Sequence, residues 1–300
     1  MTRILVIIDP DETEHTALSR IREIPPTADV DYKVDLYVDA RPVAASRADQ
    51  NAVREFLTEK RTWLDGLVKP LKDVGYRITT EVIAYTRLYE DIIKSARQCK
   101  ADFVFKPLRQ HGALRRTFYT STDWNLIRLC PMPLLLVNDQ TSVHNKPIVA
   151  AVDVSDEDEA HKALNRIVLE QSKLLSRILE ADVHVLFAYQ PVSMNSASVV
   201  AGGTVAYNIT RDQYEAEHKA AVALAKSFEI DEGQVHLREG APDIAVSEYA
   251  SEIDAGVTVL GTVARKGASG LFIGNTAEAV VERTATDVFV VKPGDFKAPV

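Results

Sequence analysis

Apolar residues in this chain gather in short runs that alternate with longer amphipathic segments. Runs of this kind, rich in valine, isoleucine and leucine, are typical of buried β-strands. They lie at 3–9, 34–39, 78–83, 103–105 and 134–137, and again at 148–153, 183–188, 234–237, 257–260 and 288–291. Between them, segment 52–74 carries apolar residues close to helical period. The alternation predicts an α/β fold with a parallel sheet covered by helices on both faces.

The second half of the chain repeats the first. Residues 3–9 (RILVIID) correspond to 148–153 (IVAAVD), and both runs end in an aspartate. Thr120-x-x-Asp123 and Asn275-x-x-Glu278 stand at matching places, and both patterns predict a capping box at a helix N-terminus. A polar, proline-terminated segment lies between the halves, as is typical of a linker. We therefore expect two domains of one fold, residues 1–142 and residues 147–300.

Composition limits the kind of partner. The chain has 300 residues, a formal net charge of −8 and 46% apolar residues, which argues against a general nucleic-acid or anionic-membrane binder. No apolar run approaches the ~20 residues of a transmembrane helix, and the start of the chain lacks a signal-peptide pattern. Cys99 and Cys130 have no metal-ligand spacing and fit a reducing compartment. These features predict a cytoplasmic protein that does not bind membranes.

Residues 261–278 (GTVARKGASGLFIGNTAE) carry the strongest candidate chemistry. Gly261 ends a predicted strand, Gly274 precedes a predicted helix, and Gly267 and Gly270 lie between them. Glycine lets the backbone turn sharply and approach a ligand closely. A helix N-terminus adds unpaired N–H groups and partial positive charge. The segment therefore predicts a phosphate-binding loop, with a connection that binds nothing as the alternative.

The same residues carry a resemblance to a known family. Nucleotide-binding universal stress proteins share the pattern G-x2-G-x9-G-[S/T], which appears here as Gly261, Ala264, Gly274 and Asn275. Ala264 stands at the second glycine of the pattern, and Asn275 stands where the pattern has serine or threonine. The string VLGTVARKGASGLFIGNTAEAVVERTATDVFVVKP extends the likeness, and over nearly its whole length the chain resembles tandem universal stress proteins of the E type. This implies two flavodoxin-like, Rossmann-like domains, each with a five-stranded parallel sheet in the order 3-2-1-4-5 and a ligand site between strands 1 and 4.

The resemblance also implies a site in the second half and its ligand. Asp153 would lie near the base and ribose of an adenine nucleotide, and Ala188 would offer backbone groups to the base. The remaining residues would surround the phosphates: Gly261, Thr262, Ala264, Arg265, Gly274, Asn275 and Thr276. ATP or AMP, with Mg²⁺, is the expected ligand of a regulatory stress protein. Two alternatives stay open: Asp153 can be only a turn residue, and the pocket can hold another small or lipid-like ligand or none.

The first half has lost the glycine pattern. Lys106 stands in the place of Gly261, and Tyr119 in the place of Gly274, where its bulk would block a backbone approach. We therefore expect this half not to bind nucleotide. Its basic residues either bind another anion or form a solvated loop: Lys106, Arg109, His111, Arg115 and Arg116. No catalytic constellation or metal-ligand spacing stands out, so we expect no enzyme, with weak ATP hydrolysis left open.

The strand order predicts how the halves meet. In a 3-2-1-4-5 sheet the runs 134–137 and 288–291 are apolar edge strands, which associate unless they are covered. We expect them to pack against each other about a pseudo-twofold axis, since the linker holds the halves at roughly millimolar effective concentration. Self-association of the whole chain stays open. Segment 191–208 is expected to be a lid, a pocket wall or disordered, with a helix starting after Thr210.

Overall fold

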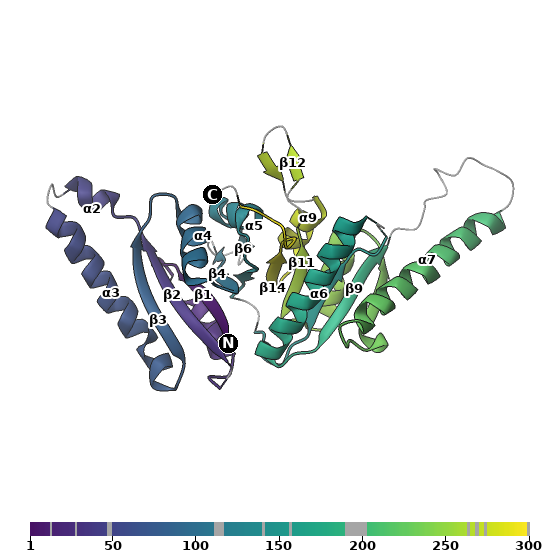
Figure 1. The fold of residues 1–300 in the computed structure, drawn as a ribbon, viewed down its shortest axis with the longest axis horizontal. Helices are drawn as coiled ribbons and strands as arrows, with labels where there is room; N and C mark the ends of the chain where they lie inside the picture. Colours follow the sequence, from purple (N-terminus) through teal and green to yellow (C-terminus); the bar gives the residue numbers. More distant parts are fainter. Residues whose placement is uncertain are drawn as a thin grey trace.

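The computed structural model describes the chain except residues 13, 28, 47–49, 111–116, 140–141, 156–157, 190–202, 263–264, 268–269, 273–274 and 299–300. Two α/β halves stand side by side and share one continuous sheet (Figure 1). The first half has strands β1 (Thr2–Ile8), β2 (Val30–Val38), β3 (Arg77–Ala84), β4 (Phe103–Pro107), β5 (Arg109–Gln110), β6 (Thr117–Phe118) and β7 (Leu134–Val137). Its helices are α1 (Thr16–Arg22), α2 (Arg41–Ser46), α3 (Gln50–Asp73), α4 (Leu88–Cys99) and α5 (Ser121–Leu129).

The second half repeats this plan. Its strands are β8 (Ile148–Val152), β9 (Val183–Tyr189), β10 (Val235–Glu239), β11 (Val257–Gly261), β12 (Arg265–Gly267), β13 (Gly270–Phe272) and β14 (Asp287–Val291). Its helices are α6 (Glu159–Leu179), α7 (Gly203–Lys226), α8 (Pro242–Glu252) and α9 (Asn275–Arg283), with a 3-10 turn at Glu232–Gln234. Helix α7 corrects the prediction of a start after Thr210, because the helix already includes Thr210 in its interior.

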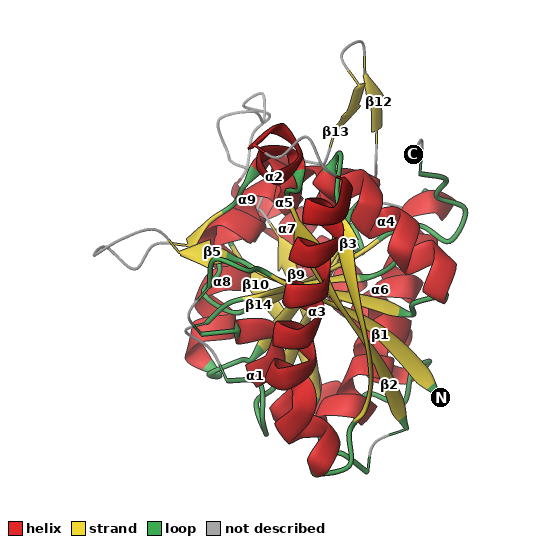
Figure 2. Cartoon of the chain, turned by 90° about the vertical axis from the view of Figure 1, so that its left-hand side faces the viewer, coloured by secondary structure: helices red, strands yellow, loops and turns green. Residues whose placement is uncertain are grey.

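The sheet order confirms the predicted fold. It reads β10-β9-β8-β11-β14-β7-β4-β1-β2-β3, which is two copies of 3-2-1-4-5 joined at their fifth strands. Within each copy the strands are parallel. Helices cover both faces (Figure 2). The strands need cover on both faces because apolar side chains lie on both. In β1, Ile4 and Val6 pack in the layer with α1 and α3. Leu5 and Ile7 pack in the layer with α4 and α5.

The two halves join through their predicted edge strands. Strand β14 pairs antiparallel with β7, with Phe289 opposite Leu135. Both strands are buried, and Phe103 meets Phe289 edge to face with ring centroids 5.2 Å apart. The expected docking is therefore confirmed in a stronger form, because the halves share backbone hydrogen bonds and not packing alone.

A buried ion pair accompanies this strand pairing. Arg20 of α1 reaches across to Asp287 at the start of β14, with Nε 2.7 Å from Oδ2 and Nη2 donating to Oδ1 at 2.9 Å. Arg20 is 2% exposed and Asp287 0%. The Asn138 backbone N–H donates to the same carboxylate at 2.8 Å, and Glu23 binds Arg20 at 2.6 Å. The Arg20 charge and the N–H donors offset part of the cost of burying this carboxylate, and burial still raises the pKa of Asp287 to about 7.

The residues around this pair also anchor the linker. Asn138 Nδ2 donates to the Ala285 carbonyl at 3.0 Å, from one half to the other. Glu23 accepts from the Val143 N–H at 2.6 Å and the Ser142 hydroxyl at 2.8 Å. The connection between the halves is thus held against α1, and not only tethered at its ends.

Loss of one partner of the Arg20–Asp287 pair should destabilise the fold strongly. Arg20→Met leaves Asp287 buried without its counter-charge, and we expect a loss of about 3–5 kcal/mol in the free energy of unfolding by urea. The double variant Arg20→Met with Asp287→Leu should recover most of that loss, since no buried charge remains. A single variant within about 1 kcal/mol of the parent would contradict this account.

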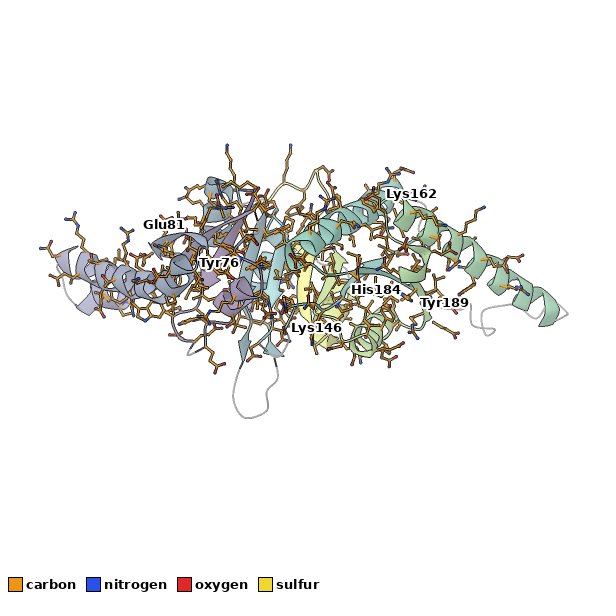
Figure 3. All side chains as sticks on the ribbon, turned by 90° about the horizontal axis from the view of Figure 1, so that it is seen from below. Tyr76, Glu81, Lys146, Lys162, His184 and Tyr189 are labelled. Carbon is orange, nitrogen blue, oxygen red and sulfur yellow. The ribbon has the colours of Figure 1, made fainter. Side chains whose placement is uncertain are left out.

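A second polar cluster lies between the outer strands and α8. His184 of β9 (labelled in Figure 3) contacts the Tyr249 hydroxyl at 3.0 Å and His236 Nε2 at 3.2 Å, both through Nδ1. The Arg238 guanidinium lies 5.1 Å from the centre of the Tyr249 ring and pairs with Glu252. Burial lowers the pKa of both histidines, and for His236 the neighbouring His184 and Arg238 lower it further. Both imidazoles are therefore neutral in the folded chain near neutral pH.

The histidine cluster predicts a loss of stability in acid. In the unfolded chain these histidines take up protons near their ordinary pKa of 6.5, whereas the folded chain resists protonation. The free energy of unfolding should therefore fall as the pH falls below about 6.5. His236→Gln should make that fall shallower, and His144→Gln, at an exposed linker position, should leave it unchanged. Urea titrations across this range measure it, and identical slopes in all three chains would contradict it.

Candidate functional site

A cavity of about 260 Å³ opens at the carboxyl ends of β8, β9 and β11. Strand β8 lies between the other two, so this is the place where the strand order reverses and crossovers leave in opposite directions. Three strands, α6, α8 and α9 supply its walls: Ala151, Val152, Asp153, His161, Leu164, Asn165, Val168, Leu186, Phe187, Ala188, Pro242, Val246, Leu260, Gly261, Ala277 and Val280. Of the predicted site residues, Asp153, Ala188 and Gly261 meet here.

Most of this wall is apolar. The strands contribute Val152, Phe187 and Leu260, and α6 contributes Leu164 and Val168. Polar groups enter at the end where the strands stop. An apolar chamber with a few polar groups at one side is the usual composition of a small-molecule pocket.

Asp153 and Asn165 form the polar edge of the cavity. The Asp153 carboxylate accepts from the Ser155 N–H at 3.1 Å and from the Ser155 hydroxyl at 2.6 Å, which is the turn geometry that the sequence left open. Asn165 of α6 accepts from the Asp153 N–H at 3.1 Å and donates to the Asp153 carbonyl. Sequence reasoning missed Asn165, because an asparagine inside a helix gives no signal until the helix is placed against the strand end. Asp153 itself remains exposed at the rim.

Gly261 is required by close packing. A Cβ at this position would lie 2.7 Å from Leu164 Cγ and 2.8 Å from Leu164 Cδ2. Its counterpart in the first half, Lys106, carries a long side chain. The cavity of the second half therefore lies beside a position that has no side chain, whereas the first half has a lysine there.

Thr262 is not among the residues that line the cavity. Its side chain is buried at 1% exposure, and its backbone N–H donates to the Val291 carbonyl at 2.9 Å. The Thr262 hydroxyl accepts from Lys292 Nζ. The remaining predicted residues are only partly described: Ala264 and Gly274 lie outside the described residues, and Arg265, Asn275 and Thr276 are placed by their backbone elements alone.

The glycine-rich segment differs from the open loop that the sequence predicts. It contains an antiparallel hairpin in which Arg265 pairs with Phe272 and Gly267 with Gly270. The hairpin stands out from the body of the fold (Figure 2), and β13 lies against α5 of the first half. The two strands are only three residues long each, Arg265–Gly267 and Gly270–Phe272, which gives no alternating pattern in the sequence. Arg265 therefore belongs to a hairpin strand.

The first half has a cavity of about 450 Å³ at the equivalent place, but with different chemistry. Lys106, at 6% exposure, lies in its wall and binds Asp123 Oδ1 at 2.6 Å. Asp123 also closes the capping box of α5 with Thr120. The Lys106 charge is therefore neutralised within the protein. His111, Arg115 and Arg116 lie outside the described residues, and Arg109 is placed by its strand alone.

Tyr119 has a contact that the sequence did not reveal. Its hydroxyl donates to the Val281 carbonyl of α9 at 2.9 Å, from one half to the other. Arg128 of α5 approaches Glu278 of α9 at 3.3 Å. The helices that begin at the two candidate sites thus contact each other across the junction.

The described residues also bear on metal binding and on membrane insertion. Among them, no group of three or more histidine, cysteine, aspartate or glutamate side chains is arranged to hold a metal ion. Within the same part of the chain, no helix is both long enough and apolar enough to cross a membrane.

Comparisons with known proteins agree with this architecture. The model of the universal stress protein family matches the chain twice, at residues 1–138 and 144–292. Universal stress protein E of Salmonella typhi is 31% identical over 99% of this chain and 96% of its own length. The Haemophilus influenzae homologue is 28% identical over 97% of both chains. A solved protein of unknown function from Pseudomonas aeruginosa PAO1 is 27% identical, with a TM-score of 0.76 over 98% of this chain and 93% of that one.

The contact between Gly261 and Leu164 can be tested by a double-mutant cycle. Gly261→Ala should cost about 1–3 kcal/mol of unfolding free energy, because the new methyl group overlaps Leu164. Leu164→Ala alone should cost about 2–5 kcal/mol. In the double variant the methyl group has room, so the combined loss should be smaller than the sum. Strict additivity would mean that the two positions do not meet.

Proposed function

This chain belongs to the universal stress protein family, and we propose that it is a cytoplasmic regulatory protein that binds one adenine nucleotide in its second half. The ligand is ATP or AMP, with Mg²⁺ accompanying it, and the protein is not an enzyme. The observation that carries this proposal is the cavity at the carboxyl ends of β8, β9 and β11. Nucleotides bind at this reversal of strand order in doubly wound α/β folds.

The shape and lining of the cavity support a nucleotide base. Phe187, Leu186 and Val246 provide an apolar chamber for a flat heterocycle. The Ala188 backbone at the end of β9 supplies hydrogen-bonding groups at the rim. The Asn165 side chain holds both the N–H and the carbonyl of Asp153. The Asp153 carboxylate is thereby positioned to accept from ribose hydroxyls.

Helix α9 supports the phosphate end of the proposal. It begins at Asn275, and Ala277 and Val280 of this helix line the cavity. The N–H groups at its start and its partial positive charge favour an anion. We assign the phosphates to the backbone around Gly261 and Gly274 and to Asn275 and Thr276, whose amide and hydroxyl groups replace the family's usual hydroxyl residue.

A different ligand is the second candidate. The cavity wall is mainly apolar, and the two departures at Ala264 and Asn275 weaken the nucleotide pattern. Both features favour a small apolar or lipid-like molecule over a phosphate-bearing one. The two candidates differ in charge, so they make different predictions for binding.

We assign no nucleotide to the first half. Lys106 occupies the place of Gly261 and is committed to Asp123, and Pro107 removes a backbone donor that a phosphate would use. Tyr119, at the place of Gly274, is committed to Val281.

Calorimetry with ATP is the direct test. We expect one molecule of ATP per chain, together with a rise in the thermal unfolding temperature that grows with ATP concentration. Binding of a fluorescent fatty acid, measured in parallel, tests the second candidate, which is a lipid-like ligand. Heat and a thermal shift with the fatty acid only would favour the lipid-like ligand, and two equivalent ATP sites would contradict the assignment of the first half.

A bulky residue at the predicted phosphate site should abolish binding. Gly274→Tyr places in the second half the side chain that Tyr119 places in the first, and ATP affinity should fall below detection. Tyr119→Phe is the matched control, because it loses only the bond to Val281, and it should bind ATP like the parent chain. Unchanged affinity in Gly274→Tyr would remove residue 274 from the site.

A further inference from the structure

Lys292 is a buried cation near the start of the glycine-rich segment. It follows β14 directly and is 6% exposed. Its ammonium donates to the Thr262 hydroxyl in the second half and to the Ile127 carbonyl in the first. The Phe296 ring lies 5.3 Å from Lys292 Nζ. Thr262 is the residue after Gly261, so this charge contacts the residue that follows the cavity wall in the chain.

The described partners of Lys292 include no carboxylate. Within the described part of the chain, no aspartate or glutamate forms an ion pair with it. Ile127 lies in the last turn of α5, where the helix dipole gives partial negative charge. The other two neighbours are a neutral hydroxyl and a ring face. An isolated buried ammonium is costly, and such groups are normally paired.

The first half offers an internal comparison. Lys106 is buried to the same 6% beside its own cavity, but it has a carboxylate, Asp123, at 2.6 Å. The two halves thus each place one buried lysine near the equivalent cavity. In the first the negative charge comes from the protein, and in the second the described residues provide none.

We propose that Lys292 supplies positive charge under the site of the second half, and that the ligand of this site carries an anionic group that completes the charge balance. This inference rests on the proposed function and narrows it to a phosphate-bearing ligand. The Thr262 hydroxyl, which accepts from Lys292, holds the ammonium against the backbone that begins the glycine-rich segment. Lys292 is thus a positioning residue that acts on the ligand through this segment and through its charge.

The affinity of this site for an anion should depend on pH. Burial lowers the pKa of Lys292 to about 8, and the nearby Cys130 of the first half adds no negative charge. Cys130 is neutral in this range, because its own burial raises its pKa to about 11. A bound anion stabilises the ammonium and so raises the pKa of Lys292 again. Anion affinity should therefore be full below about pH 8 and fall as the pH rises above it.

The experiment compares ATP with adenosine on the full-length chain, by calorimetry near pH 7 and near pH 9. We expect ATP to bind about tenfold more weakly at the higher pH, while adenosine, which has no charge, binds equally at both. Lys292→Met should weaken ATP binding to a similar degree at both pH values. Lys292→Arg keeps the charge and should bind ATP without the pH dependence. Lys297→Met, at an exposed position of the same tail, is the matched control.

The outcomes separate this inference from the proposed function. If ATP binds with equal affinity at both pH values and in Lys292→Met, the role of Lys292 is wrong and nucleotide binding stands. If ATP and adenosine both fail to bind, tripolyphosphate becomes the probe. A thermal shift with tripolyphosphate that is lost at high pH and in Lys292→Met would support an anion site, and it would contradict the proposal that a nucleotide binds there. The wild-type comparison needs no variant, so a folding defect in Lys292→Met leaves the test intact.

Discussion

The antiparallel pairing of β7 with β14 is the interaction on which the rest of the structure depends. Each strand would otherwise be an apolar sheet edge, with unpaired backbone groups that invite association. Their pairing makes one ten-stranded sheet and removes both edges. It also brings α5 of the first half against α9 and the C-terminal tail of the second, so that Tyr119, Arg128 and Ile127 contact the second half. The first half therefore contacts the helix and the tail that flank the candidate site, while the cavity wall itself comes from the second half.

The two halves share a fold and differ in chemistry at the same place. In the first, Lys106 and Asp123 form an ion pair beside the cavity and satisfy each other. In the second half, Gly261 stands at the position of the lysine, and Leu164 packs against this glycine. The buried positive charge belongs to Lys292, which donates to the Thr262 hydroxyl. The two halves thus share the scaffold and the place of the cavity, but they balance the charge of a buried lysine differently. Among the described residues, Lys106 is paired with a carboxylate and Lys292 is not.

The fold was predictable because its signals are local. Apolar runs that alternate with amphipathic segments predict the strands and helices, and their repetition predicts two copies of one fold. The strand order followed from the resemblance to the family, and that order identified the edge strands that pair. The Arg20–Asp287 pair joins residues 267 positions apart, and no pattern in the sequence links them. The hairpin of β12 and β13 was missed because its glycines resemble a loop. Asn165 and Lys292 were missed because a lone polar residue beside an apolar run normally faces solvent, and only tertiary packing buries these two.

The central claim is that the second half alone binds the nucleotide, at the end of β8 and β11. Hydrogen exchange of the full-length chain with and without ATP tests it most directly, because exchange reports on each segment separately. The account predicts slower exchange in the peptides that cover the start of α6, the end of β11 and the start of α9, with no change in those that cover β4 and the start of α5. Equal protection in both halves, or protection in neither, would contradict it.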